Sequence, residues 1–149
     1  MIGVTITPSQ IDYSKIITPE TVEKMIVGEC VILTGFAKEL VPVDKGELKN
    51  SLMWTTNDNE GGFNDGSGAT PAPPDAKIDR PNDDITGYCG SGSDHAGPVE
   101  FGRKDMPSYP RQPYLRPAVD YSKKQRETRR QGIIKTAIKQ AYKPGTNNG

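Results

Sequence analysis

The chain has 149 residues, of which 33% are hydrophobic and 7% aromatic, with 16 Gly, 13 Pro and a formal net charge of zero. A compact domain of this length has one core, because it buries about two thirds of the surface of its unfolded chain, and no segment approaches the roughly 20 apolar residues that cross a bilayer. We therefore expect a single domain over residues 1–149, synthesised and kept in a cytoplasm, with no membrane-spanning segment and with part of the chain outside the core.

Residues 19–40 are predicted to form an amphipathic helix. Thr18 suits the N-cap, Pro19 suits the first helical position, and Glu20 places an acid where the helix dipole favours one. Pro42 ends the helix. The apolar residues recur at helical spacing and form one stripe for burial, made of Val22, Ile26, Cys30, Leu33, Ala37 and Leu40.

A small antiparallel sheet is predicted in the middle of the chain. After a turn at 44–46, residues 51–56 have the composition of a strand with Trp54 as its large apolar residue. The segment around Tyr88 supplies a second strand that pairs with the first. Residues 57–98 contain 8 Gly and 5 Pro, so we interpret 57–84 as an extended loop, a hairpin or an arm that reaches a neighbouring subunit.

The chain ends in a predicted basic helix. Pro117 suits a first helical position, and helically spaced apolar residues follow it, interrupted by the polar run "SKKQRETRRQG". We expect the middle of this helix to face solvent or a partner and residues 143–149 to be a flexible tail. The predicted fold is α+β, with the N-terminal amphipathic helix and the basic C-terminal helix packed on a small antiparallel sheet.

Charge is segregated along the chain. Residues 44–101 contain 4 basic and 11 acidic side chains, whereas residues 103–143 contain 12 basic and 3 acidic ones. A basic run of this kind is a solvated face, a phosphate-binding surface or a surface that pairs with an acidic partner, and all three interpretations stay open. Because no aromatic residues interleave the run, DNA contact would be non-specific. The candidate DNA-channel contacts are Lys123, Lys124, Arg126, Arg129 and Arg130.

Few residues are available for catalysis or metal binding. Ser93, Asp94 and His95 are consecutive in the chain, so they cannot converge as a catalytic triad. Cys30 and Cys89 are too few for a disulfide framework or a zinc site, and we interpret both as reduced and buried. The acidic stretches do not follow a calcium-loop pattern. We predict no enzyme, no metal and no cofactor, and we treat His95 as a surface or interface residue.

Three short segments, in order, carry a resemblance to a known family. Residues 42–51, "PVDKGELKNS", residues 95–103, "HAGPVEFGR", and residues 113–118, "PYLRPA", resemble the conserved segments of the tail-component family of long-tailed bacteriophages. The matching residues are Pro42, Gly46, Leu48, Ser51, Ala96, Val99, Glu100, Phe101, Gly102, Pro113, Leu115, Arg116, Pro117 and Ala118. The chain departs from the family pattern at His95, Pro98, Arg103 and Tyr114, which changes surface or packing character without removing a catalytic group.

The resemblance implies a structural virion protein, similar to tail completion or neck proteins at the head-to-tail junction. Such a protein would assemble as a homo-oligomeric ring, with hexamer and dodecamer as the copy numbers considered, and would join or seal head and tail while letting DNA pass. The implied partners are further copies, other neck, connector and tail-tube proteins, and packaged DNA through non-specific contact, but no membrane. The alternative is a DNA-binding accessory protein that acts through the basic helix, and a small hydrolase is a distant third.

The predicted interface comes from the second and third segments. Aromatic and arginine side chains anchor interfaces, and the prolines on either side of Tyr114 and Arg116 stiffen the chain there. Packing within the subunit, beneath the two helices, is the alternative for Tyr114 and Leu115. The interface candidates are Glu100, Phe101, Gly102, Arg103, Tyr114 and Arg116.

Overall fold

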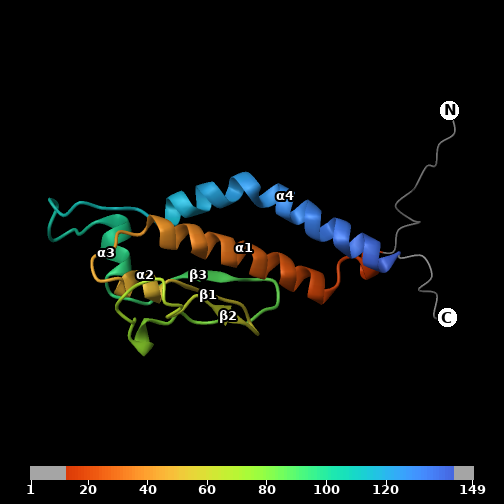
Figure 1. The fold of residues 1–149 in the computed structure, drawn as a ribbon, viewed down its shortest axis with the longest axis horizontal. Helices are drawn as coiled ribbons and strands as arrows, with labels where there is room; N and C mark the ends of the chain where they lie inside the picture. The colour runs from red at the N-terminus through yellow and green to blue at the C-terminus, as the bar shows by residue number, and fades with distance from the viewer. Residues whose placement is uncertain (1–12, 143–149) are drawn as a thin grey trace.

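The computed structural model describes residues 13–142, and predictions for the first residues and for the 143–149 tail lie outside this range. The longer elements are α1 (Pro19–Leu40), α2 (Glu47–Ser51), β1 (Met53–Thr55), β2 (Glu60–Gly61), β3 (Tyr88–Gly90), α3 (Ala96–Phe101) and α4 (Leu115–Ala141), with 3-10 turns η2 (Tyr13–Lys15) and η3 (Pro74–Ala76). In Figure 1, α1 lies between antiparallel α4 and the sheet. The predicted α+β fold is confirmed, and α4 packs on α1 rather than directly on the sheet.

Helix α1 begins and ends at the predicted residues. The hydroxyl of Thr18 accepts a hydrogen bond from the backbone N–H of Thr21 at 3.2 Å, which caps the helix. The buried face differs from the predicted apolar stripe, because Thr34 and Lys38 are buried whereas Leu40 is exposed. Since α1 contacts α4 on one side and the sheet on the other, two faces of the helix are covered rather than one.

The sheet has the order β2-β1-β3 and is antiparallel throughout. The predicted pairing of the two strands is confirmed, with Trp54 opposite Cys89. The sequence did not predict β2 or α2, and the first strand is shorter than predicted because residues up to Ser51 belong to α2. Gly46 permits this, since it takes a left-handed φ of +85° immediately before the helix.

Residues 57–84 fold back onto the body of the domain. The ammonium group of buried Lys38 contacts the carbonyl oxygen of Gly62 at 2.6 Å, the Ser67 hydroxyl at 3.1 Å and the Asp65 carboxylate at 2.9 Å. The side-chain amide of Asn50 donates to the carbonyl oxygens of residues 68 and 70 at 2.7 and 2.8 Å. In one copy, the segment is therefore part of the domain surface and not a detached arm.

The main hydrophobic cluster lies at the end of the molecule where α1 stops and α4 starts. Its buried members are Ala37, Val41, Leu52, Tyr114 and Ala118, and Phe36, Leu48, Val99 and Leu115 pack against them. All three segments that carry the family resemblance contribute to this cluster. These segments consequently meet in space at one end of the domain, although they are far apart in the chain.

Candidate interaction site at the α2–α3 end

Glu100 joins the second and third segments by capping α4. Its carboxylate accepts backbone hydrogen bonds from Tyr114 at 2.7 Å, Leu115 at 2.9 Å and Arg116 at 3.0 Å. The next residue, Pro117, has no N–H to satisfy, so the carboxylate completes the first turn. This explains why α4 starts two residues earlier than predicted, with Pro117 in its third position.

The environment of Glu100 favours its charged form. Burial by itself raises the pKa of Glu100, but the backbone hydrogen bonds from Tyr114, Leu115 and Arg116 outweigh burial and lower the pKa below its ordinary value. The side chain is therefore a carboxylate at neutral pH, placed where the positive end of the α4 dipole stabilises it.

Tyr114 and the nearby Gln112 also join the start of α4 to α3. Its hydroxyl donates a hydrogen bond to the carbonyl oxygen of Ala96 at 3.1 Å, and the backbone N–H of Gln112 donates to the carbonyl oxygen of Val99 at 2.8 Å. Burial and, to a lesser extent, the Glu100 charge raise the pKa of Tyr114 to about 12. The hydroxyl consequently stays protonated and keeps its donor function.

Two predicted interface residues are corrected by this geometry. Glu100 is 5% exposed and Tyr114 is fully buried, so neither side chain is available to a partner. Both hold α3 and α4 together within one copy, which was the alternative considered for Tyr114. Half-buried Leu115 also packs against the core, as that alternative required.

The remaining interface candidates lie at the surface. Phe101 is 80% exposed, and the side chains of Arg103 and Arg116 are also exposed. Gly102 adopts a φ of +83° and ends α3 by donating its N–H to the carbonyl oxygen of Pro98 at 2.8 Å, a conformation that other residues rarely adopt. An exposed aromatic ring beside an arginine is the combination that anchors protein interfaces.

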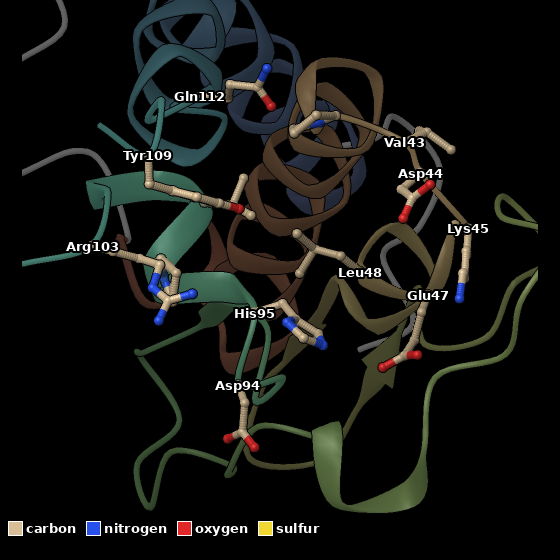
Figure 2. A pocket seen from close by; sticks show the side chains of 14 residues that line it. Val43, Asp44, Lys45, Glu47, Leu48, Asp94, His95, Arg103, Tyr109 and Gln112 are labelled. Atoms are coloured by element: carbon tan, nitrogen blue, oxygen red, sulfur yellow. The ribbon is translucent and has the colours of Figure 1, made fainter. Parts of the chain in front are cut away.

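A hollow of about 730 Å³ lies beside these residues, between α2 and α3. In Figure 2, Leu48, His95 and Tyr109 approach one another across it, with Arg103 at one rim. The other lining residues include Pro42, Val43, Asp44, Lys45, Glu47, Asp94 and Gln112. The apolar floor and charged rim are typical of a surface that receives a side chain of a protein partner.

His95 is the N-cap residue of α3 and directly follows Ser93 and Asp94 in the chain. Its backbone N–H donates to the Ser93 hydroxyl at 3.3 Å, and within residues 13–142 no hydrogen bond joins its imidazole ring to Ser93 or Asp94. No group of three or more His, Cys, Asp or Glu side chains in that range could hold a metal ion. The exposed imidazole is available as a contact at the rim of the hollow.

The five candidate DNA contacts on α4 divide into two groups. Arg126 and Arg129 both bind the carboxylate of Glu29 on α1, at 3.1 and 2.9 Å. Burial raises the pKa of Glu29, but the hydrogen bonds from Arg129 and Arg126 lower it by a larger amount. The pKa of Glu29 is therefore below its ordinary value. Arg126 and Arg129 thus link the two helices, and their assignment as DNA contacts stays a prediction.

The other three candidates lie at the surface of α4. Lys123, Lys124 and Arg130 are exposed, and among the residues that the structure describes they form no ion pair. The Lys124 ammonium lies 5.3 Å from the ring centroid of Tyr121. These three residues remain candidates for contact with DNA or with an acidic protein surface.

The two cysteines lie together between α1 and the sheet. Cys30 is buried and Cys89 is half-buried, and both are free thiols, with the Cys89 sulfur 3.8 Å from the carbonyl oxygen of Cys30. The Cys89 side chain and burial raise the pKa of Cys30 well above its ordinary value. Cys30 is therefore a protonated core residue, as predicted.

Sequence reasoning missed the polar residues that organise the domain. Lys38 was not recognised as buried, although it follows Thr34 by one helical turn on the covered side of α1. Asn50 has a weak helix propensity and lies between the predicted turn at 44–46 and the predicted strand at 51–56, where no helix was expected. Neither residue lies at a predicted core position, so the hydrophobic pattern carried no signal for its burial.

No helix in residues 13–142 is long and apolar enough to span a membrane. Comparisons with protein families, with curated proteins and with solved structures find no match for this chain. The resemblance to the phage tail-component family therefore depends on its three segments alone.

Proposed function

We propose that this protein is a structural subunit of the head-to-tail junction of a long-tailed bacteriophage, similar to tail completion or neck proteins. The observation that supports this function best is the convergence of the three resembling segments at one end of the domain. Leu48 comes from the first segment, Val99 from the second and Leu115 from the third, and all three pack against one core cluster. The segments thus behave as parts of one module, as expected if the resemblance has a common structural origin.

The same module carries a surface suited to protein contact. The hollow between α2 and α3 combines an apolar floor at Leu48 and Val99 with charged groups at Asp44, Glu47 and Arg103. Phe101 projects into solvent next to it. We assign this end of the domain to contacts with other neck, connector or tail-tube proteins, or with a neighbouring copy.

Opposite charges on two faces favour association of identical copies. Helix α4 has eight basic and two acidic residues, whereas residues 57–84 have seven acidic and two basic ones. The two regions lie on opposite sides of α1 (Figure 1). A closed ring needs such a heterologous contact, in which one surface of each copy meets a different surface of the next. The ring would join head and tail, seal the junction and let DNA pass.

A DNA-binding accessory protein is the second candidate, and the exposed Lys123, Lys124 and Arg130 favour it. Contacts of this kind are non-specific, and their affinity falls steeply with salt. With Arg126 and Arg129 bound to Glu29, however, fewer cations are free than the sequence indicated.

The test is the mass of the purified protein across a concentration series, measured by light scattering and native mass spectrometry, alone and with tail-tube and connector proteins of the same virus. We expect a discrete multiple of the 16.2 kDa chain, or a shift to one on adding a partner. Binding to duplex DNA is measured in parallel across a salt series. A monomer that ignores every virion protein but binds duplex DNA tightly at physiological salt would replace the junction proposal with the DNA-binding one.

A further inference from the structure

We propose that the contact between copies joins the C-terminal half of α4 in one copy to the acidic 79–88 segment of the next. This inference rests on the proposed function, because it names the surfaces through which the ring would close. The α4 surface, here termed the basic patch, comprises Arg130, Ile134, Lys135, Ile138 and Lys139. The acidic patch comprises Asp79, Asp83, Asp84, Ile85 and Tyr88.

The basic patch combines exposed apolar side chains with positively charged ones. Ile134 and Ile138 are one helical turn apart and are 40% and 42% exposed, although α4 packs on α1 with other residues. Arg130, Lys135 and Lys139 are exposed around them, and none forms an ion pair within residues 13–142. DNA phosphates would neutralise the cations but would leave the two isoleucines uncovered, so a protein surface is the better match.

The acidic patch has the complementary composition. Ile85 is 75% exposed and Tyr88 is also exposed, while the carboxylates of Asp79, Asp83 and Asp84 lie at the surface. Asp79 and Tyr88 line the same hollow beside β3. Each patch thus combines exposed apolar side chains with charged ones, which are anionic in the acidic patch and cationic in the basic patch. Complementary surfaces of this kind are expected in a specific protein contact.

The acidic patch is held in shape before any partner binds. Asp83 accepts hydrogen bonds from the backbone N–H of Ile85 and from the Thr86 hydroxyl, both at 2.9 Å. Asp84 accepts a hydrogen bond at 2.8 Å from the side chain of Asn57, at the other end of the 57–84 segment. Fixed side chains lose less conformational freedom on association, so this surface is suited to docking a rigid helix.

The two patches cannot meet within one copy because α1 separates them. On its sheet side, Glu23 accepts hydrogen bonds from Thr56 and Asn59 at 3.0 and 2.8 Å, next to the acidic segment. On its other side, Thr21 and Lys24 line a hollow with α4 residues 129–140. The two segments that carry the patches thus lie at the same level of α1 but on opposite sides of it (Figure 1), which fits a contact that repeats from copy to copy.

The experiment uses two full-length variants with reversed charge. The first is Lys135→Glu/Lys139→Glu, and the second is Asp79→Lys/Asp84→Lys, which keeps the hydrogen bonds of Asp83 but removes the one between Asp84 and Asn57. Self-association is measured by analytical ultracentrifugation and native mass spectrometry, and folding by circular dichroism. We expect each variant alone to associate at least about tenfold more weakly than the wild type. An equimolar mixture restores association, because each reversed patch then finds a partner of opposite charge.

Matched controls and a defined set of outcomes separate this inference from the ring proposal. Lys123→Glu/Lys124→Glu and Asp58→Lys/Asp75→Lys make the same charge changes outside the patches and should leave association unchanged. If the wild type forms a ring but neither reversal weakens it, or if mixing fails to restore association, the assigned contact is wrong and the ring proposal survives. A wild type that stays monomeric at every concentration and with every virion protein overturns both.

Discussion

Helix α4 and the 57–84 segment differ in a way that secondary structure alone does not reveal. The helix is regular over 27 residues, yet only Ala118 and Ser122 are buried. The segment has a two-residue strand and a three-residue 3-10 turn, yet it buries Ala72 and Ala76 and is held by hydrogen bonds from Lys38. The irregular segment is therefore as much a part of the folded body as the regular helix.

This difference has a physical cause. A helix satisfies its own backbone groups, so α4 needs packing on one side only. An irregular segment must find a partner for each buried N–H and C=O group elsewhere, and here the partners are polar side chains of the body. The exposed helix remains free to bind another molecule, whereas the segment presents a fixed acidic surface. Substitutions at four positions test this difference, in order of the stability loss expected from each.

Glu100→Ala should have the largest effect, because α4 loses the cap that fixes its start. Three backbone N–H groups near the core would lose their acceptor, which costs about 3 kcal/mol of unfolding free energy. Chemical denaturation measures the loss, and Glu127→Ala on the exposed side of α4 is the matched control. Equal stability of Glu100→Ala and the wild type would show that the capping hydrogen bonds do not hold α4 in place.

The pH dependence of stability tests the capping role of Glu100 in a second way. The pKa of Glu100 lies below its reference value of 4.5 in the folded protein, so its stabilising contribution is present above that value and is lost as the pH falls through the lowered folded pKa. We expect the wild type to lose stability on acidification below about pH 4.5. Glu100→Gln should show a shallower loss in the same titration, because the group that titrates has been removed.

Gly46→Ala tests the attachment of the 57–84 segment to α2. Position 46 has a φ of +85°, and a Cβ atom there would lie 2.7 Å from the backbone nitrogen of Ala69 and 2.8 Å from the Cα of Gly68. We expect a loss of about 2–3 kcal/mol, measured by thermal unfolding. A Cβ atom at Gly35 in α1 would have no neighbour within 4 Å. Gly35→Ala should therefore be neutral or stabilise the protein by up to about 1 kcal/mol. Equal effects of the two substitutions would refute the close approach.

Lys38→Met should release the segment without affecting α4. The substitution keeps most of the buried side-chain volume but removes the donors to Gly62 and Ser67, for a loss of about 2 kcal/mol. Hydrogen exchange is the decisive measurement, with faster exchange expected over residues 62–70 and unchanged exchange over residues 115–125. Lys24→Met, an exposed change on the same helix, serves as control. Uniformly faster exchange would mean that the segment and α4 open together.

Local patterns predicted the elements that depend on local interactions. Thr18, Pro19 and the apolar spacing defined α1 to the residue, and the β1–β3 pairing followed from two short strand-like segments. The burial of Glu100 could not be predicted in this way, because its hydrogen-bond donors lie 14 to 16 residues away. The same holds for Lys38 and Asn50, whose partners are carbonyl groups in a segment with no periodic pattern.

Only part of the candidate site could be predicted from the sequence, because its residues come together only in the folded chain. The motif segments pointed to one end of the molecule, and Phe101 and Arg103 are exposed there. Sequence alone could not separate Tyr114, which is buried, from Phe101, which is exposed, because each is an aromatic residue two positions before an arginine in a turn-rich stretch. The hollow was also missed, since residues 42–48, 94–103 and 109–112 line it together only after folding.

Glu29→Gln should have the smallest effect on stability and the most informative effect on function. Its partners are Arg126 and Arg129, of which Arg129 is 17% exposed, so we expect a loss of about 1 kcal/mol, tempered by solvent screening. The amide no longer neutralises the two arginines, and α4 becomes both looser and more cationic. If α4 acts on DNA, duplex affinity should rise in low salt, measured by fluorescence anisotropy against Glu20→Gln as control. If α4 instead serves contacts between copies, self-association should weaken while DNA affinity stays low, because a displaced helix presents its isoleucines at a different angle.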